Sequence, residues 1–159
     1  MVRTNVLQSN VGRIIFVEDE RVLCDMYRDV FEKEGYDFFI TDDIQQGLDL
    51  TKFEQPDAVL LDIIIPKPEN TIAEQGYDYL KAVKENPETK NVPIIVFTNL
   101  DTPQDRKKCK DMGAAAYLFK RDCTPKEVVE AVAEVIKRDK EKKVAEKVDN
   151  QPLSVSEQK

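Results

Sequence analysis

Residues 58–66 have the sequence AVLLDIIIP, an aliphatic run interrupted by a single carboxylate, Asp62. A short apolar run of this kind is typical of a strand that is buried on both faces, as in a parallel sheet. A carboxylate inside such a strand is costly unless a cation or hydrogen-bond donors accompany it. We therefore expect Asp62 at the C-terminal end of the strand, where open α/β sheets bind their ligands. On this stretch alone, a helix cap or a strand-end loop remains the alternative.

The composition predicts one globular domain and excludes several kinds of chemistry. The chain has 159 residues, of which 41% are hydrophobic and 35% charged, as expected for a single domain with a real core. It has no histidine, which excludes histidine catalysis, histidine metal ligation and phosphohistidine within this chain. The net charge of −7 argues against nucleic acid as the main partner. The three cysteines form no CxxC pair and are interpreted as reduced thiols.

No apolar run approaches the length that spans a membrane, and the polar N-terminus lacks the apolar block of a signal peptide. We therefore expect a cytoplasmic location and no membrane insertion.

Strand-like and helix-like segments alternate along the chain. β-branched or apolar runs predict strands at 13–17, 38–41, 58–62, 92–97 and 114–119. Amphipathic segments predict helices at about 22–34, 76–85 and 125–136, and a weaker pattern predicts one at 44–52. A Thr102-Pro103 cap predicts a further helix at 103–112, which has few apolar residues and should pack thinly on the sheet. Five strand–helix units predict an α/β fold, a doubly wound five-stranded parallel sheet with helices on both faces.

The predicted domain covers residues 13–138, between a polar leader at 1–12 and a charged, flexible tail at 139–159. The segment 137–147 holds six basic and three acidic residues, so it should not belong to the folded core. It can instead continue the last helix or contact an acidic partner surface. Thr124 and Pro125 begin that last helix with a capping sequence.

Polar residues end four of the predicted strands: Glu18 with Asp19, then Asp62, Thr98 and Lys120. Because the carboxyl ends of parallel strands meet at one edge of a sheet, these side chains should lie together. Clustered carboxylates suit Mg²⁺, and a lysine beside a hydroxyl suits an anion that arrives on that cation. The set predicts phosphoryl transfer to Asp62, with Mg²⁺ and Lys120 neutralising charge and Thr98 hydrogen-bonding the phosphoryl group. Each residue alone has an ordinary structural explanation, so the prediction depends on their joint spacing.

At these motifs the chain resembles the response-regulator receiver domains of two-component signalling, in particular single-domain regulators of the chemotaxis type. The matching stretches, within about residues 13–138, are Glu18-Asp19, LDIIIP at 61–66, PIIVFT at 93–98 and GAAAYLFK at 113–120. The resemblance implies a flavodoxin-like strand order, 2-1-3-4-5. It also implies that a histidine kinase or a phosphotransfer protein phosphorylates Asp62.

The resemblance assigns further roles. Mg²⁺ would be bound by Glu18, Asp19, Asp62 and the backbone carbonyl of Ile64. Thr98 and Tyr117 would form the switch pair: Thr98 moves to the phosphoryl group and Tyr117 turns inward behind it.

Two side chains should control how long the phosphoryl group lasts. In receiver domains, the residues two positions after the phosphorylated aspartate and two after the switch threonine flank the approach of water. Here these residues are Ile64 and Leu100, neither of which can hydrogen-bond a water, and Asn99 beside them narrows the path. We expect slow autodephosphorylation.

The chain departs from the family pattern in four places. Glu18 stands where an aspartate is usual, Asn99 where a small residue is usual, and Arg121 where a proline often follows the lysine. We expect the Lys120–Arg121 peptide bond to be trans, because a cis bond without proline costs roughly 2.5–4 kcal/mol. The loop 67–75 is longer than usual, and its role is unassigned.

Two other functions compete with the phosphorylatable receiver. A haloacid-dehalogenase-like phosphatase also uses an aspartyl nucleophile and Mg²⁺, but it needs a DxD pattern on the first strand, which residues 18–20 do not supply. A degenerate receiver would act only as a binding module, and the intact Asp62, Thr98 and Lys120 argue against it. We therefore expect a signalling protein rather than an enzyme, with a downstream protein target that docks on the exposed face of the last helices.

Overall fold

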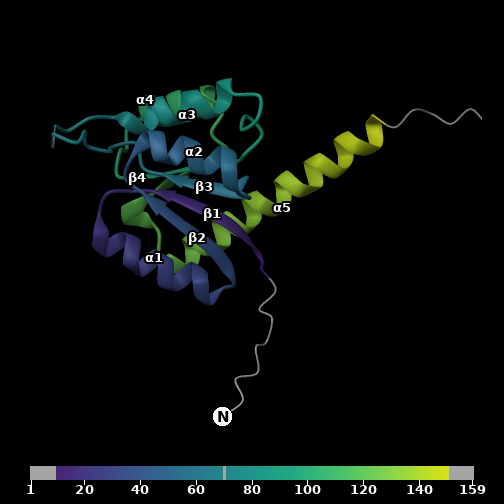
Figure 1. Cartoon of the computed structure of the whole chain (residues 1–159), viewed down its shortest axis with the longest axis horizontal. Helices are drawn as coiled ribbons and strands as arrows, with labels where there is room; N and C mark the ends of the chain where they lie inside the picture. Colours follow the sequence, from purple (N-terminus) through teal and green to yellow (C-terminus); the bar gives the residue numbers. More distant parts are fainter. Residues whose placement is uncertain (1–9, 70, 151–159) are drawn as a thin grey trace, which may run out of the picture.

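The computed structural model describes residues 10–69 and 71–150, which form a sheet flanked by helices (Figure 1). The strands are β1 (Gly12–Val17), β2 (Tyr36–Thr41), β3 (Ala58–Leu61), β4 (Ile94–Thr98) and β5 (Ala116–Phe119). The helices are α1 (Arg21–Lys33), α2 (Ile44–Glu54), α3 (Gln75–Glu85), α4 (Pro103–Asp111) and α5 (Pro125–Asp149). A short 3-10 turn, η1 (Lys120–Asp122), follows β5.

All strand pairs are parallel, and the order is β2-β1-β3-β4-β5. This confirms the flavodoxin-like prediction. Every residue of β3 is buried, which explains why its sequence is apolar without alternation. Because β1 and β3 pair side by side, the residues that follow them meet at one edge of the sheet.

Alternate residues of the strands supply two separate cores. Ile14 and Phe16 of β1 pack with α1 and α5 on one face of the sheet. Ile15 and Val17 pack on the other face with α2, α3 and α4. Figure 1 shows α2 and α3 on the opposite side of the sheet from α1. As expected from its few apolar residues, α4 buries only Cys109.

The helix starts follow the predicted capping chemistry. Thr102 and Thr124 each accept a hydrogen bond from a backbone N–H of the first helical turn, and proline occupies the first position in both helices. The fold therefore agrees with local sequence signals as well as with the hydrophobic pattern.

The C-terminal segment continues the last helix, which is one of the alternatives expected for residues 137–147. Helix α5 continues without a break to Asp149 and projects beyond the sheet (Figure 1). The sequence 139–149 is rich in good helix formers, and α5 extends an already nucleated helix, so no new nucleation is needed. Residues 151–159 of the expected tail lie outside the described residues, as do residues 1–9 of the expected leader; Gly12 already belongs to β1.

Truncation after Arg138 should leave the melting temperature nearly unchanged. The side chains removed are mostly exposed, including Val144 at 62% and Val148 at 65% exposure, so little apolar burial is lost. Thermal unfolding followed by circular dichroism, with the full chain as reference, measures this directly. A large drop would show that the projecting part of α5 stabilises the domain.

No helix within the described residues is both long enough and apolar enough to cross a membrane.

Candidate functional site

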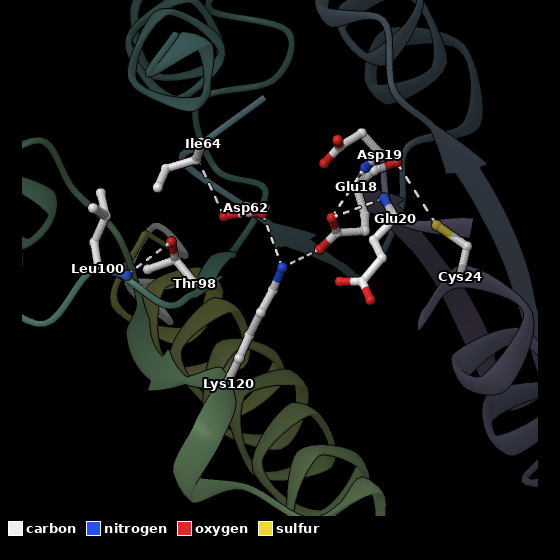
Figure 2. A network of polar contacts seen from close by, with 9 residues as sticks. All are labelled: Glu18, Asp19, Glu20, Cys24, Asp62, Ile64, Thr98, Leu100 and Lys120. Carbon is white, nitrogen blue, oxygen red and sulfur yellow. Dashed lines mark hydrogen bonds and ion pairs between the residues drawn. The ribbon is translucent and has the colours of Figure 1, made fainter. Parts of the chain in front are cut away.

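The carboxyl ends of the strands bring Glu18, Asp62 and Lys120 into direct contact (Figure 2). The Lys120 ammonium donates to Asp62 Oδ2 at 2.9 Å and also to Glu18 Oε2. Glu18 is 2% exposed and Asp62 is 6% exposed, so both carboxylates are largely removed from water. The structure thus confirms that residues from three separate strand ends share one site.

Asp19 completes an acidic cluster that opens to solvent. Glu18, Asp19 and Asp62 each present a carboxylate oxygen within 4.8 Å of the others, and Asp19 is exposed. Three oxygen ligands with one open side fit a hard divalent cation such as Mg²⁺, which retains several of its waters. The donor set present in this chain therefore fits the expected metal.

The electrostatics of the site reflect crowded negative charge. Burial and the neighbouring Asp62 carboxylate raise the pKa of Glu18 to about 7, although Lys120 acts in the opposite direction. Burial alone would lower the pKa of Lys120, but attraction to Asp62 and Glu18 outweighs it and raises that pKa. The lysine therefore stays charged, and the site contains an excess of carboxylate that a divalent cation would neutralise.

Backbone donors fix the two buried carboxylates. The N–H groups of Asp19 and Glu20 donate to Glu18 Oε1 at 3.0 and 3.2 Å, which holds this longer side chain back against its own strand end. The N–H of Ile64 donates to Asp62 Oδ1 at 3.2 Å. Each carboxylate thus has one oxygen held by the backbone and the other held by Lys120 (Figure 2).

The expected switch residues meet at Leu100. Thr98, the last residue of β4, is fully buried, and its hydroxyl oxygen accepts from the Leu100 N–H at 3.4 Å. The Tyr117 hydroxyl donates to the Leu100 carbonyl, while the Arg106 guanidinium lies 5.0 Å from the centre of the Tyr117 ring. One residue of the β4–α4 loop therefore contacts both members of the pair.

A cleft of about 420 Å³ lies over the acidic cluster. Ile64 and Asn99 line it, as expected, whereas Leu100 is half-buried and packs against the core on the α2–α4 side. Ile72, which is 84% exposed, also borders the cleft, so the long loop contributes an apolar side chain that the sequence does not predict there.

Gly76 allows α3 to begin directly behind the site. Its N–H donates to the Ile63 carbonyl at 2.9 Å. A Cβ atom at Gly76 would lie 2.4 Å from the Asp62 carbonyl oxygen and 2.4 Å from the Ile63 Cα. The sequence predicts a helix start at Gly76 but does not reveal this close approach to the backbone of Asp62. No peptide bond within the described residues is cis, which confirms the trans Lys120–Arg121 bond.

Comparison with known proteins decides the family. The model of the response regulator receiver domain matches residues 14–133. The chain belongs to the response-regulator receiver domains. The receiver domain is 27% identical over 113 residues to the polar-differentiation response regulator DivK of Brucella anthropi, covering 71% of this chain and 87% of that protein.

Solved structures show the same receiver fold. A CheY-like response regulator receiver domain from Methanospirillum hungatei superposes with a TM-score of 0.73 at 22% identity, covering 84% of this chain and 99% of that one. The receiver domain of a sensor histidine kinase from Pseudomonas aeruginosa, with magnesium coordinated in its active-site cleft, gives 0.66 at 24% identity, covering 79% and 97%.

The receiver domain described here is therefore a phosphorylatable response regulator of two-component signalling. Receiver domains are signalling modules that interact with histidine kinases or phosphotransfer proteins and with downstream targets. The findings support neither the phosphatase nor the phosphorylation-independent binding module.

Proposed function

We propose that Asp62 accepts the phosphoryl group, from a histidine kinase or a phosphotransfer protein. The observation that supports this assignment is the direct contact of Asp62 with Lys120 inside the acidic cluster, at the carboxyl end of β3. The chain has no histidine, so a phosphohistidine donor must be another protein. The proposed function is that of a cytoplasmic signalling module rather than an enzyme.

The transfer needs a nucleophile and compensation of charge. A carboxylate oxygen of Asp62 attacks phosphorus as the bond from phosphorus to the donor nitrogen breaks, and the electron pair stays on that nitrogen. Lys120 donates hydrogen bonds to the anionic oxygens as they form. Glu18, Asp19, Asp62 and the Ile64 carbonyl would hold Mg²⁺, which when bound neutralises charge on the phosphoryl oxygens.

The switch follows from the contacts of Thr98 and Tyr117. A phosphoryl group on Asp62 offers the Thr98 hydroxyl a stronger acceptor than its present surroundings. Movement of Thr98 toward it breaks the contact with the Leu100 N–H and thereby moves the loop that Tyr117 holds. The loop leads into α4, so the altered surface lies on the last helices, where we propose that the downstream target docks.

The test is incubation with acetyl phosphate and Mg²⁺ followed by intact mass measurement. The wild type should gain one phosphoryl group, and Asp62→Asn should gain none. Asp49→Asn, an exposed aspartate on α2, is a control that should behave like the wild type. Rapid release of phosphate without an adduct would instead indicate a phosphatase, and no adduct at all would indicate a binding module.

Mg²⁺ binding should depend on Asp19. Replacing this exposed carboxylate by asparagine in Asp19→Asn removes one of three clustered charges, so we expect at least about tenfold weaker binding, equivalent to about 1.4 kcal/mol. Titration calorimetry measures the affinity, with Asp25→Asn on the exposed side of α1 as a control. Unchanged affinity in Asp19→Asn would remove this residue from the metal site.

Autodephosphorylation should be slow and should speed up in Ile64→Asn. Ile64 lines the cleft, and an amide there can align a water opposite the Asp62 oxygen. We expect about a tenfold faster release of phosphate from Ile64→Asn. Leu100→Glu should accelerate the release of phosphate less, because Leu100 is half-buried in the core and does not line the cleft. Fast hydrolysis by the wild type that neither substitution changes would contradict the steric explanation.

A further inference from the structure

A groove of about 360 Å³ lies at the end of the sheet opposite Asp62. Its walls come from Lys84 near the end of α3, from the segments at the amino ends of β4 and β5, and from residues 135–146 in the distal part of α5. The distal α5 lies beyond the part of the chain that the receiver family model covers, which ends at residue 133. Figure 1 shows this part of α5 extending away from the sheet into solvent.

Positive charge dominates the groove although the whole chain carries −7. Five cationic side chains line it: Lys84, Lys90, Arg138, Lys142 and Lys143. Two carboxylates, Asp139 and Glu146, face them, and Asp139 pairs with Lys143 at 2.6 Å. The lining therefore has a net charge of +3, although Arg138 also pairs with Glu134, just outside the lining, at 3.0 Å. Within the described residues, Lys84, Lys90 and Lys142 form no ion pair, which leaves their charge for an external anion.

Lys84 is the fixed member of this set. Its ammonium donates to the backbone carbonyls of Lys90 and Val92, both at 3.1 Å. The ammonium group is therefore held against the wall of the groove and does not move freely in solvent. Burial lowers the pKa of Lys84, Asp139 opposes this and Lys142 adds to it. A positive group that is partly desolvated and faces another cation gains more from a bound anion than an isolated surface lysine does.

The shape and chemistry of the groove limit the ligand. Ammonium groups act as point charges toward phosphate, and several of them around one hollow suit several phosphates in one small molecule. Pro93, Ala115 and Val135 add apolar surface, and Asn91 adds an amide that can both donate and accept. A hollow of this volume suits a small molecule. An extended nucleic acid would instead reach beyond the groove, where the negative charge of the rest of the chain repels its phosphates.

We propose that the basic groove, formed by Lys84, Lys90, Arg138, Lys142 and Lys143, binds a compact polyphosphate anion of the nucleoside triphosphate or inorganic polyphosphate class. The groove shares no residue with the acidic cluster at Asp62, so this proposal does not depend on phosphorylation of the receiver domain.

The test uses the full chain in low salt with EDTA, so that no divalent cation links an anion to the acidic cluster. ATP and inorganic tripolyphosphate serve as the two probes, and isothermal titration calorimetry measures binding. We expect saturable binding of at least one probe that weakens as salt is raised, because the contacts are ionic. Tighter binding of ATP would show that the apolar side chains Pro93, Ala115 and Val135 contact the nucleoside. Equal or tighter binding of tripolyphosphate would identify the inorganic polyphosphate.

Two double variants distinguish binding in the groove from general attraction to the net charge of the protein. Lys90→Glu with Lys142→Glu reverses two charges that line the groove, and binding should weaken at least about tenfold. Lys140→Glu with Lys147→Glu makes the same change in net charge on exposed positions of α5 that do not line the groove. This control should bind within about twofold of the wild type. Thermal unfolding checks that both variants fold.

Three results would overturn the proposal. One is the absence of saturable binding of either probe. Another is equal weakening by both double variants, which would show attraction to net charge alone. The third is loss of binding in Lys120→Gln together with retention in the groove variant, which would place the anion at the phosphorylation site.

Discussion

Lys120→Ala should lower the rate of phosphorylation by acetyl phosphate at least about 100-fold, the effect expected for losing one donor to developing charge. Among the described residues, Lys120 is the only cation in an ion pair with Glu18 or Asp62. Without it, the incoming anionic phosphoryl group meets two buried carboxylates with no fixed positive charge. The rate is measured as the growth of the phosphorylated mass in the presence of saturating Mg²⁺.

In Lys120→Ala, the affinity for Mg²⁺ should not fall with the phosphorylation rate. The Lys120 ammonium lies between Glu18 and Asp62, so its removal makes the acidic cluster more negative, and Lys120→Ala should bind Mg²⁺ as tightly as the wild type or tighter. Lys107→Ala, an exposed lysine on α4, should change neither quantity. A parallel loss of Mg²⁺ affinity, phosphorylation and melting temperature would show that Lys120 acts only by holding the fold together. An unchanged phosphorylation rate would contradict its role in the transfer.

The sequence predicts most of this fold because the signals are local and agree with one another. The run ending at Asp62 is apolar throughout since β3 is buried on both faces, and the threonine–proline pairs before α4 and α5 mark both helix starts. The site is predictable for the same reason: in a parallel sheet, residues at strand ends must share one edge. Glu18, Asp62 and Lys120 therefore come together without any knowledge of the loops.

What the sequence does not predict depends on contacts between segments far apart in the chain. The Lys120 ammonium bridges two carboxylates, and Ile72 reaches the cleft from the long loop; neither follows from spacing. Residues 139–149 have good helix propensity but almost no apolar face, and their charge alone favoured a flexible tail. Continuation of α5 adds a hydrogen bond per residue to an existing helix, which charge composition does not reveal.

Gly76→Ala should be among the most damaging single substitutions in the receiver domain. The added Cβ would lie 2.4 Å from the Asp62 carbonyl oxygen and 2.4 Å from the Ile63 Cα. Both are backbone atoms that cannot rotate away, so either α3 or the end of β3 must move. Overpacking of this kind costs typically about 1–3 kcal/mol, and backbone displacement adds to that. We expect a clear drop in melting temperature and at least about tenfold slower phosphorylation, because Asp62 moves relative to Lys120.

Gly47→Ala is the matched control, because Gly47 is also buried and lies inside a helix, α2. The nearest atoms to its added Cβ would be side-chain carbons, Tyr79 Cε2 at 3.3 Å and Thr41 Cγ2 at 3.5 Å, so a displacement of a few tenths of an ångström relieves the contact. Alanine also gains up to about 1 kcal/mol of helix propensity over glycine, so the melting temperature should change little in either direction. Equal effects of the two substitutions would contradict a specific role for the contact of α3 with Asp62. A stable Gly76→Ala that phosphorylates normally would show that β3 and α3 can separate without disturbing the site.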